Sequence, residues 1–270
     1  MDLELLIASV LISLLGLPHG ALDPIVAHRY GLFKQASGCL YFLLGYLVIS
    51  ALGLMFWYLS PLVSLVIFLG YSAIHFGRDW SKVTSFGGAP YGCLVIGLPA
   101  YFHPAEVQNI YQMITADLGA DYVLIVNWIF IICGVTYLLM TLIAGSLRRL
   151  SRYAWLEIFS LTACAYLCSP LWYFVIFFCV LHSPRHLISE LGSLTDSHRI
   201  KAIIVMVVIT IITLGFVSLF GVQLRVELSA LDTFTYQAIF IGLSVLTVPH
   251  MLLMEWVRYD TDQALIDAES

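Results

Sequence analysis

The chain has 270 residues, of which 61% are hydrophobic and 11% are charged, and its formal net charge is −5. Soluble chains contain about 25% charged residues, and a core of this size cannot enclose so much apolar surface. The composition therefore excludes an ordinary water-soluble domain, a disordered protein and a nucleic-acid binder with a basic face. We expect an all-α, polytopic integral membrane protein in which residues 1–270 form one domain.

Apolar runs that approach the ~20 residues of a membrane helix recur along the whole chain. The first run follows an acidic start and has no cleavage site, so we expect it to stay as a span rather than act as a signal peptide. The longest connection covers residues 104–120. The fourth and sixth runs are short and could be re-entrant, so eight full spans are possible, although nine are preferred. The nine predicted segments are 3–22, 38–59, 61–77, 90–103, 121–145, 154–168, 171–190, 201–222 and 234–257.

The basic residues are strongly segregated between the two ends of these segments. With nine spans, only Arg225 falls on one side of the membrane, and Arg185 lies within a span. Because positive residues are retained in the cytoplasm, we expect the N-terminus outside the cell membrane and the C-terminus in the cytoplasm. The residues on the cytoplasmic side would be Arg29, Lys34, Arg78, Lys82, Arg148, Arg149, Arg152, Arg199, Lys201 and Arg258.

Five of the eight histidines lie inside predicted spans. A helix rise of ~1.5 Å per residue puts all five within about 12 Å of the cytoplasmic helix ends, on four different spans. Ionisable side chains inside a membrane are costly and usually functional. We therefore favour a metal or haem site in the cytoplasmic half over five separate packing roles. The five are His19, His75, His182, His186 and His250.

The spacing of these histidines adds geometry. His182 and His186 are four residues apart, so they project from one helix face and can bind one metal together. Three of the histidines are followed at the fourth position by a carboxylate, which could orient a ligand ring or could be ordinary charge at a helix end. Glu157 and Arg185 are expected to pair near the same surface. The histidine–carboxylate pairs are His19–Asp23, His75–Asp79 and His186–Glu190.

Four neutral imidazoles without a thiolate suit Fe(II), copper or zinc, although a zinc ion with four histidines would be closed to substrate. An intramembrane zinc protease is not expected, because Ser183 stands where its motif needs glutamate. Adjacent histidine pairs of the membrane desaturase type are absent from the sequence, and no lysine lies deep enough for a retinal Schiff base. A bis-histidine haem protein for electron transfer and a proton-coupled transporter remain open.

Four sequence blocks resemble the Brp/Blh family of bacterial and archaeal membrane β-carotene 15,15′-dioxygenases. They occur in the family's order and carry its histidines, and the resemblance extends over nearly the whole chain, from residue 16 to residue 256. The blocks are GLPHGALD at 16–23, SAIHFG at 72–77, LHSPRH at 181–186 and VPH at 248–250.

The resemblance implies a non-haem Fe(2+) centre held by histidines in the matching blocks, here His19, His75, His182 and His186. It implies that O2 cleaves the central double bond of β-carotene to give two molecules of all-trans-retinal. A functional link to a retinal-binding rhodopsin also follows from it. His250 matches a family position without an equally clear role, and we expect it to support the ligands or to line the substrate.

A long apolar polyene would reach such a site through the lipid bilayer. We expect aromatic side chains on the histidine-bearing helices to line its path, above all Phe76, Phe177 and Phe178, although each could simply pack between helices. Gly16 and Gly20 form a small-residue pair that could let helices approach closely or could leave room around His19.

Overall fold

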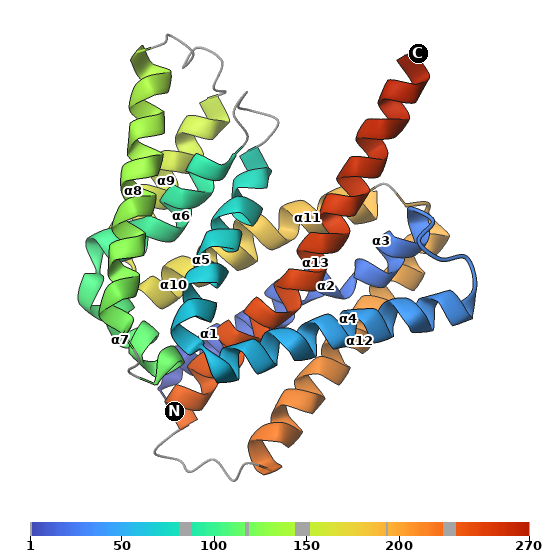
Figure 1. The fold of residues 1–270 in the computed structure, drawn as a ribbon, viewed down its shortest axis with the longest axis horizontal. Coiled ribbons are helices and arrows are strands. Elements are labelled where there is room, and N and C mark those ends of the chain that lie inside the picture. Colours follow the sequence, from blue (N-terminus) through green and yellow to red (C-terminus); the bar gives the residue numbers. More distant parts are fainter. Residues whose placement is uncertain are drawn as a thin grey trace.

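A computed structural model describes residues 2–80, 88–116, 119–143, 152–192, 194–223 and 231–269 (Figure 1). All regular structure in these ranges is helical, which confirms the all-α class. The α-helices are α1 (Leu3–Leu11), α2 (Pro18–Ala21), α3 (Asp23–Arg29), α4 (Ala36–Leu59), α5 (Pro61–Gly77), α6 (Ala89–Phe102), α7 (Pro104–Thr115), α8 (Ala120–Ile143), α9 (Arg152–Leu167), α10 (Pro170–Val175), α11 (Ser183–Gly192), α12 (Asp196–Gln223) and α13 (Leu231–Glu269).

Seven helical stretches in the described ranges are long and apolar enough to cross a membrane. They are Leu3–Arg29, Ser37–Leu59, Pro61–Trp80, Asp121–Met140, Pro170–Gly192, Asp196–Phe216 and Leu231–Asp260. The two remaining predicted segments form shorter apolar helices, at Ala89–Phe102 and Trp155–Leu167. The protein is thus a multi-pass membrane protein, and the fourth and sixth segments are short in the structure as in the sequence.

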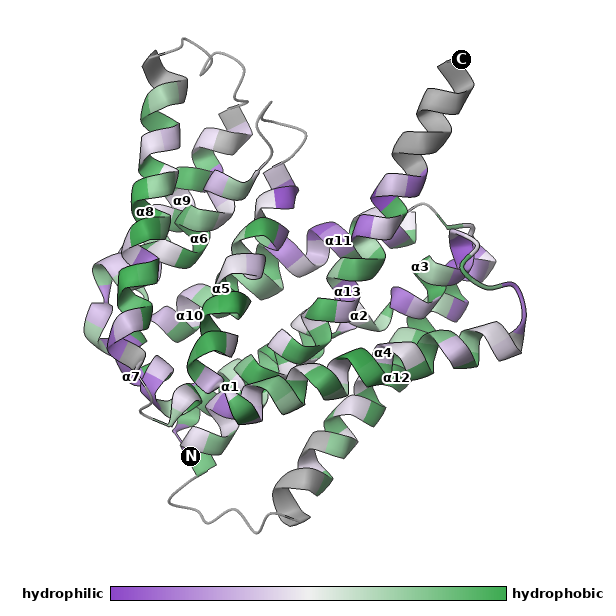
Figure 2. Ribbon diagram, in the orientation of Figure 1, coloured by the Kyte–Doolittle hydropathy of each residue, from purple (hydrophilic) through white to green (hydrophobic). Residues whose placement is uncertain are grey.

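The outer surface of the bundle is apolar. None of the most apolar window of Ser37–Leu59 is buried inside the protein, and leucines along α4 point outward. Figure 2 shows apolar residues along α4 and α8, with hydrophilic residues around α3, α11 and the connection from α3 to α4. An exposed apolar surface of this extent suits lipid rather than water.

Small residues bring α5, α6 and α8 into close contact. A Cβ atom at Gly92 would overlap the carbonyl group of Ala73, and a Cβ atom at Gly134 would overlap the side chain of Leu94. Without a hydrophobic driving force in lipid, membrane helices depend on such close backbone approach for their packing. This packing holds the C-terminal end of α5, which carries His75, against its neighbours.

Two of the spanning stretches change their helical form beside a proline. A π-helical segment at Ile12–Gly16 (η1) ends just before Pro18, and another at Ile176–His182 (η4) ends just before Pro184. A proline inside a helix removes a backbone hydrogen bond and crowds the preceding turn, which favours a local irregularity. The two segments pack against each other, and the Ser183 hydroxyl donates to the Leu15 carbonyl at 2.5 Å. The two irregular stretches therefore meet where their histidines lie.

The connection at 104–120 is more ordered than a simple loop, because it contains α7. Pro104 occupies the first turn of this helix, where its missing N–H costs nothing. The inward face buries Val107, Ile110, Tyr111 and Ile114. The connection thus forms a short amphipathic cover over the ends of neighbouring helices.

Some of the basic residues behind the expected orientation, namely Lys82, Arg148, Arg149 and Arg225, lie outside the described residues. The helix of the last segment continues through the acidic end of the chain to Glu269.

Candidate metal centre

The five intramembrane histidines converge on one place. They arrive from α2, α5, η4, α11 and α13, and all are buried except His186, which is half-buried. The ring of His19 lies with its centroid 5.5 Å from that of His182, 5.8 Å from that of His186 and 5.2 Å from that of His250. The ring of His75 lies 4.8 Å from that of His182. A single cluster thus joins residues that are up to 231 positions apart in the chain.

Three of these histidines form a potential metal site. One nitrogen each from His19, His75 and His182 lies within 4.8 Å of the others. The Nε2 atoms of His75 and His182 are only 3.1 Å apart. Two nitrogens at right angles on a metal with bonds of about 2.1 Å would be separated by about 3.0 Å. The observed donor set and spacing therefore fit a metal ion.

Acceptors on the far side of the rings orient three of the histidines. Nδ1 of His19 lies 2.5 Å from the Gly16 carbonyl oxygen. Nδ1 of His182 lies 3.0 Å from Asp79 Oδ2, and Nδ1 of His250 lies 2.8 Å from Asp23 Oδ1. Because carbonyl and carboxylate oxygens can only accept, each Nδ1 is assigned the proton. The Nε2 atoms then carry lone pairs, as in histidines that bind metals.

The carboxylates act across helices and not along them. Asp23 follows His19 by four residues but pairs with His250, and Asp79 follows His75 by four residues but pairs with His182. A ring that turns its Nε2 toward a common centre directs its Nδ1 away, where a neighbouring helix can supply the acceptor. The expected pairing within each helix is therefore replaced by pairing between helices.

Glu190 has a different setting from the other two carboxylates. Its Oε2 atom accepts a hydrogen bond from the guanidinium of Arg29 at 3.3 Å. Nε2 of His186 is buried and has no hydrogen-bond partner in the described part of the chain, and the same holds for Nδ1 of His75. These are open donor or acceptor sites beside the cluster.

An ion pair borders the centre, as the sequence predicts. Arg185 donates two hydrogen bonds to the Glu157 carboxylate, at 2.8 and 2.6 Å, and its guanidinium lies 3.7 Å from Asp79 Oδ2. The hydroxyl of Tyr91 donates to Glu157 at 2.5 Å. The guanidinium thus links the carboxylate that orients His182 to a second carboxylate on α9.

Aromatic rings close one side of the cluster. Three phenylalanine rings surround that of His182. The distance between ring centroids is 4.8 Å for Phe76, 6.1 Å for Phe177 and 5.9 Å for Phe178. A Cβ atom at Gly16 would overlap the ring of Phe178, so this glycine permits the close approach of η1 and η4. All three expected phenylalanines therefore lie beside the histidines.

A cavity of about 350 Å³ reaches the other side of the cluster. His19, Asp23 and His250 line it, and Gly20 leaves space there, since a Cβ atom at Gly20 would meet nothing within 4 Å. Helices α4 and α12 form its outer wall, which no motif in the sequence indicates. The wall residues include Leu43, Tyr46, Leu47, Ile209, Thr210, Ile212 and Thr213.

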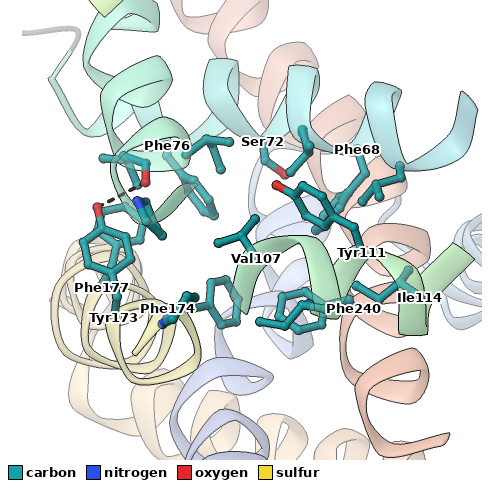
Figure 3. A pocket seen from close by; sticks show the side chains of 17 residues that line it. Phe68, Ser72, Phe76, Val107, Tyr111, Ile114, Tyr173, Phe174, Phe177 and Phe240 are labelled. Carbon is teal, nitrogen blue, oxygen red and sulfur yellow. Dashed lines mark hydrogen bonds between the residues drawn. The ribbon is translucent and has the colours of Figure 1, made fainter. Parts of the chain in front are cut away.

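A second cavity, of about 100 Å³, lies behind the aromatic rings (Figure 3). Phe76 and Phe177 separate it from His182, and Val107 and Tyr111 on α7 line its far end. Figure 3 shows Phe174 and Phe240 lining it as well. The protein thus has apolar space on two sides of its histidine cluster.

The fold and the cluster define a multi-pass membrane protein with a buried histidine site able to hold a metal. The family model for β-carotene 15,15′-dioxygenase matches residues 10–258, and the chain belongs to this family of carotene-cleaving enzymes. A protein named β-carotene 15,15′-dioxygenase, from uncultured marine bacterium 66A03, is 28% identical over 271 residues, covering 93% of this chain and 92% of the relative. No solved structure shows significant similarity to the chain.

Proposed function

We propose that this protein is an Fe(II)-dependent dioxygenase that cleaves the central 15,15′ double bond of β-carotene. One β-carotene and one O2 would give two molecules of all-trans-retinal, with one oxygen atom in each aldehyde. The observation that carries the proposal is the 3.1 Å approach of the His75 and His182 Nε2 atoms within a cluster of oriented imidazoles. The family and the name of its relative support the substrate.

His19, His75, His182 and His186 would hold the iron. Neutral imidazoles are suitable ligands for Fe(II), and the metal when bound supplies the capacity to activate O2. Asp79 and the Gly16 carbonyl keep two of these rings in the tautomer that leaves Nε2 free to bind. Phe76, Phe177 and Phe178 exclude water from the adjoining space.

The cavity of about 350 Å³ beside His19 and His250 would bind part of the polyene and provide its route from the bilayer. Two of its wall residues, Leu47 on α4 and Ile212 on α12, are each 64% exposed on the lipid-facing surface. The cavity therefore extends from the histidines to the outside of the bundle between these helices. A polyene dissolved in lipid can move laterally along this path without crossing water.

The same proposal covers the setting of the enzyme. We propose the cell membrane as its location, with the N-terminus outside and the C-terminus and the iron site on the cytoplasmic side. Retinal released into the bilayer would be available to a retinal-binding rhodopsin.

Product analysis tests the function directly. The purified protein in detergent receives Fe(II), O2 and β-carotene, and retinal is followed by chromatography for the wild type, His182→Ala and His198→Ala. His198 is an exposed histidine near the start of α12, so its replacement is a matched control. We expect about two retinal molecules per β-carotene in the wild type and the control, and none in His182→Ala.

Other outcomes would count against the proposal. Longer aldehydes in place of retinal would move the cleaved bond away from the centre of the polyene. Intact carotene in the presence of bound iron would show that β-carotene is not the substrate. Equal activity of His182→Ala and the wild type would show that the histidine cluster is not the reaction site.

A further inference from the structure

We propose that His250 is a fifth histidine ligand of the metal, binding through Nε2 and held in place by Asp23 and Tyr46. The inference rests on the proposed metal centre and deepens it, because it changes the number of protein ligands from four to five. His250 lies on α13, whereas the other four histidines lie on α2, α5, η4 and α11.

The first observation is the position of the His250 ring. Its centroid lies 5.2 Å from that of His19, 5.3 Å from that of His75 and 5.3 Å from that of His186. The ring planes are nearly perpendicular in all three pairs, between 85° and 88°. His250 thus lies against three of the other four histidine rings and is only 2% exposed.

The second observation is the state of its two nitrogens. Nδ1 donates to Asp23 Oδ1 at 2.8 Å, so Nε2 carries the lone pair. Nε2 is buried and has no hydrogen-bond partner among the described residues. A buried polar atom without a partner is costly, and buried imidazole lone pairs are the nitrogens that bind metals. His182 is held in the same way through Nδ1, by Asp79, and its Nε2 lies 3.1 Å from Nε2 of His75.

The third observation is the support behind His250. The Asp23 side chain is fully buried, and its second oxygen, Oδ2, accepts from the Tyr46 hydroxyl at 3.0 Å. A buried carboxylate needs compensation, and here two donors from different helices, α13 and α4, provide part of it. The charge of a metal ion bound by His250 would provide more. Carboxylate–histidine–metal arrangements of this kind fix the ring and raise its basicity.

A fifth ligand has a consequence for the chemistry of the site. A metal held by five protein nitrogens would have less room for an added ligand than one held by four. The polyene would then be held by the cavity wall and not by the metal. His250 lines that cavity, so it faces the substrate space from the metal side.

The test uses metal binding in place of activity. The full chain in detergent is stripped with a chelator and titrated with Co(II), whose visible spectrum reports its ligands. We compare the wild type with His250→Ala, with Asp23→Asn and with the control His198→Ala. At saturating Co(II), we expect a changed spectrum for His250→Ala only, and added imidazole should restore the wild-type spectrum by occupying the vacated position.

Affinity gives a second readout, measured by competition with the chelator. Replacing a carboxylate behind a ligand lowers metal affinity by roughly 10–100-fold, so we expect that loss for Asp23→Asn even if His250→Ala fails to fold. A wild-type spectrum for His250→Ala at saturation would overturn the proposal. If His250→Ala cannot be prepared, the proposal would be overturned by an Asp23→Asn variant that binds Co(II) as tightly as the wild type does. Absence of bound metal in the wild type would instead remove the metal centre itself, so the two failures can be told apart.

Discussion

Asp79 accepts a hydrogen bond from Nδ1 of His182 at 3.0 Å, although the two residues lie 103 positions apart. The contact connects the end of the α5 stretch to the end of η4, so one hydrogen bond fixes both a ring orientation and a helix contact. We expect Asp79→Asn to fold and to lower metal affinity by roughly 10–100-fold, because the ring loses its charged acceptor.

The measurement is metal content after equilibration with a chelator of known affinity. Asp196→Asn is the matched control, because Asp196 has an exposed carboxylate at the start of α12. Equal metal retention by Asp79→Asn and the wild type would show that Asp79 does not support a ligand.

Arg185 stands between two carboxylates, Glu157 and Asp79. We expect Arg185→Gln to lower the free energy of unfolding by about 1–3 kcal/mol, toward the lower end because the side chain is 38% exposed and screened. Removing the guanidinium leaves Glu157 with the Tyr91 hydroxyl and without its ion pair.

A double-mutant cycle measured by thermal unfolding in detergent isolates this interaction. The variant Glu157→Gln/Arg185→Gln should be less destabilised than the sum of the two single variants, since neither charge is left alone. Strict additivity would show that the ion pair contributes nothing to stability.

The five histidines could be grouped from the sequence because their depth in a membrane helix follows from counting residues. Their carboxylate partners could not, because spacing along one helix identifies neighbours on that helix only. Asp23 and Asp79 are thus at the expected positions, but each acts on a ring from a distant segment. The outer wall of the cavity could not be predicted either, because α4 and α12 have the composition of ordinary membrane spans.

Helix α7 is a different case, because its signal is present in the sequence. The apolar residues Val107, Ile110, Tyr111 and Ile114 follow the spacing of one helix face, directly after a proline suited to a first turn. The segment is too short and too polar to cross a membrane, so a search for spans passes over it. The periodicity of these four residues is therefore enough to predict an amphipathic helix within the connection.

Gly16 and Gly20 are one helical turn apart, but Gly16 is packed against a neighbouring side chain and Gly20 borders open space. We expect Gly16→Ala to destabilise the protein by about 1–3 kcal/mol, because its Cβ atom would overlap the ring of Phe178. Gly20→Ala should leave stability unchanged or slightly raised, because the added methyl group meets open space.

Thermal unfolding of the two variants in detergent compares the same substitution on the same stretch of helix. Each glycine thus illustrates one of the two roles that the pair suggests, close helix approach at Gly16 and space beside His19 at Gly20. Equal stability of the two variants would show that η1 and η4 can separate without cost.

The cavity between α4 and α12 can be filled from Thr210. Thr210→Phe places a ring in the space proposed for the polyene, and we expect kcat/KM for β-carotene to fall by roughly 10–100-fold. Metal content should not change, because Thr210 lines the cavity without belonging to the histidine cluster. The loss should appear mainly in KM, since the change removes binding space and leaves the reacting groups in place.

Ile211→Phe is the matched control for Thr210→Phe. Ile211 is the next residue on the same helix, is 63% exposed and does not line the cavity, so a phenylalanine there would face lipid. We expect this variant to cleave β-carotene as the wild type does. If both variants kept full activity, the polyene would have to reach the histidines by another path, and the smaller cavity behind Phe76 and Phe177 would become the place to introduce the next obstruction.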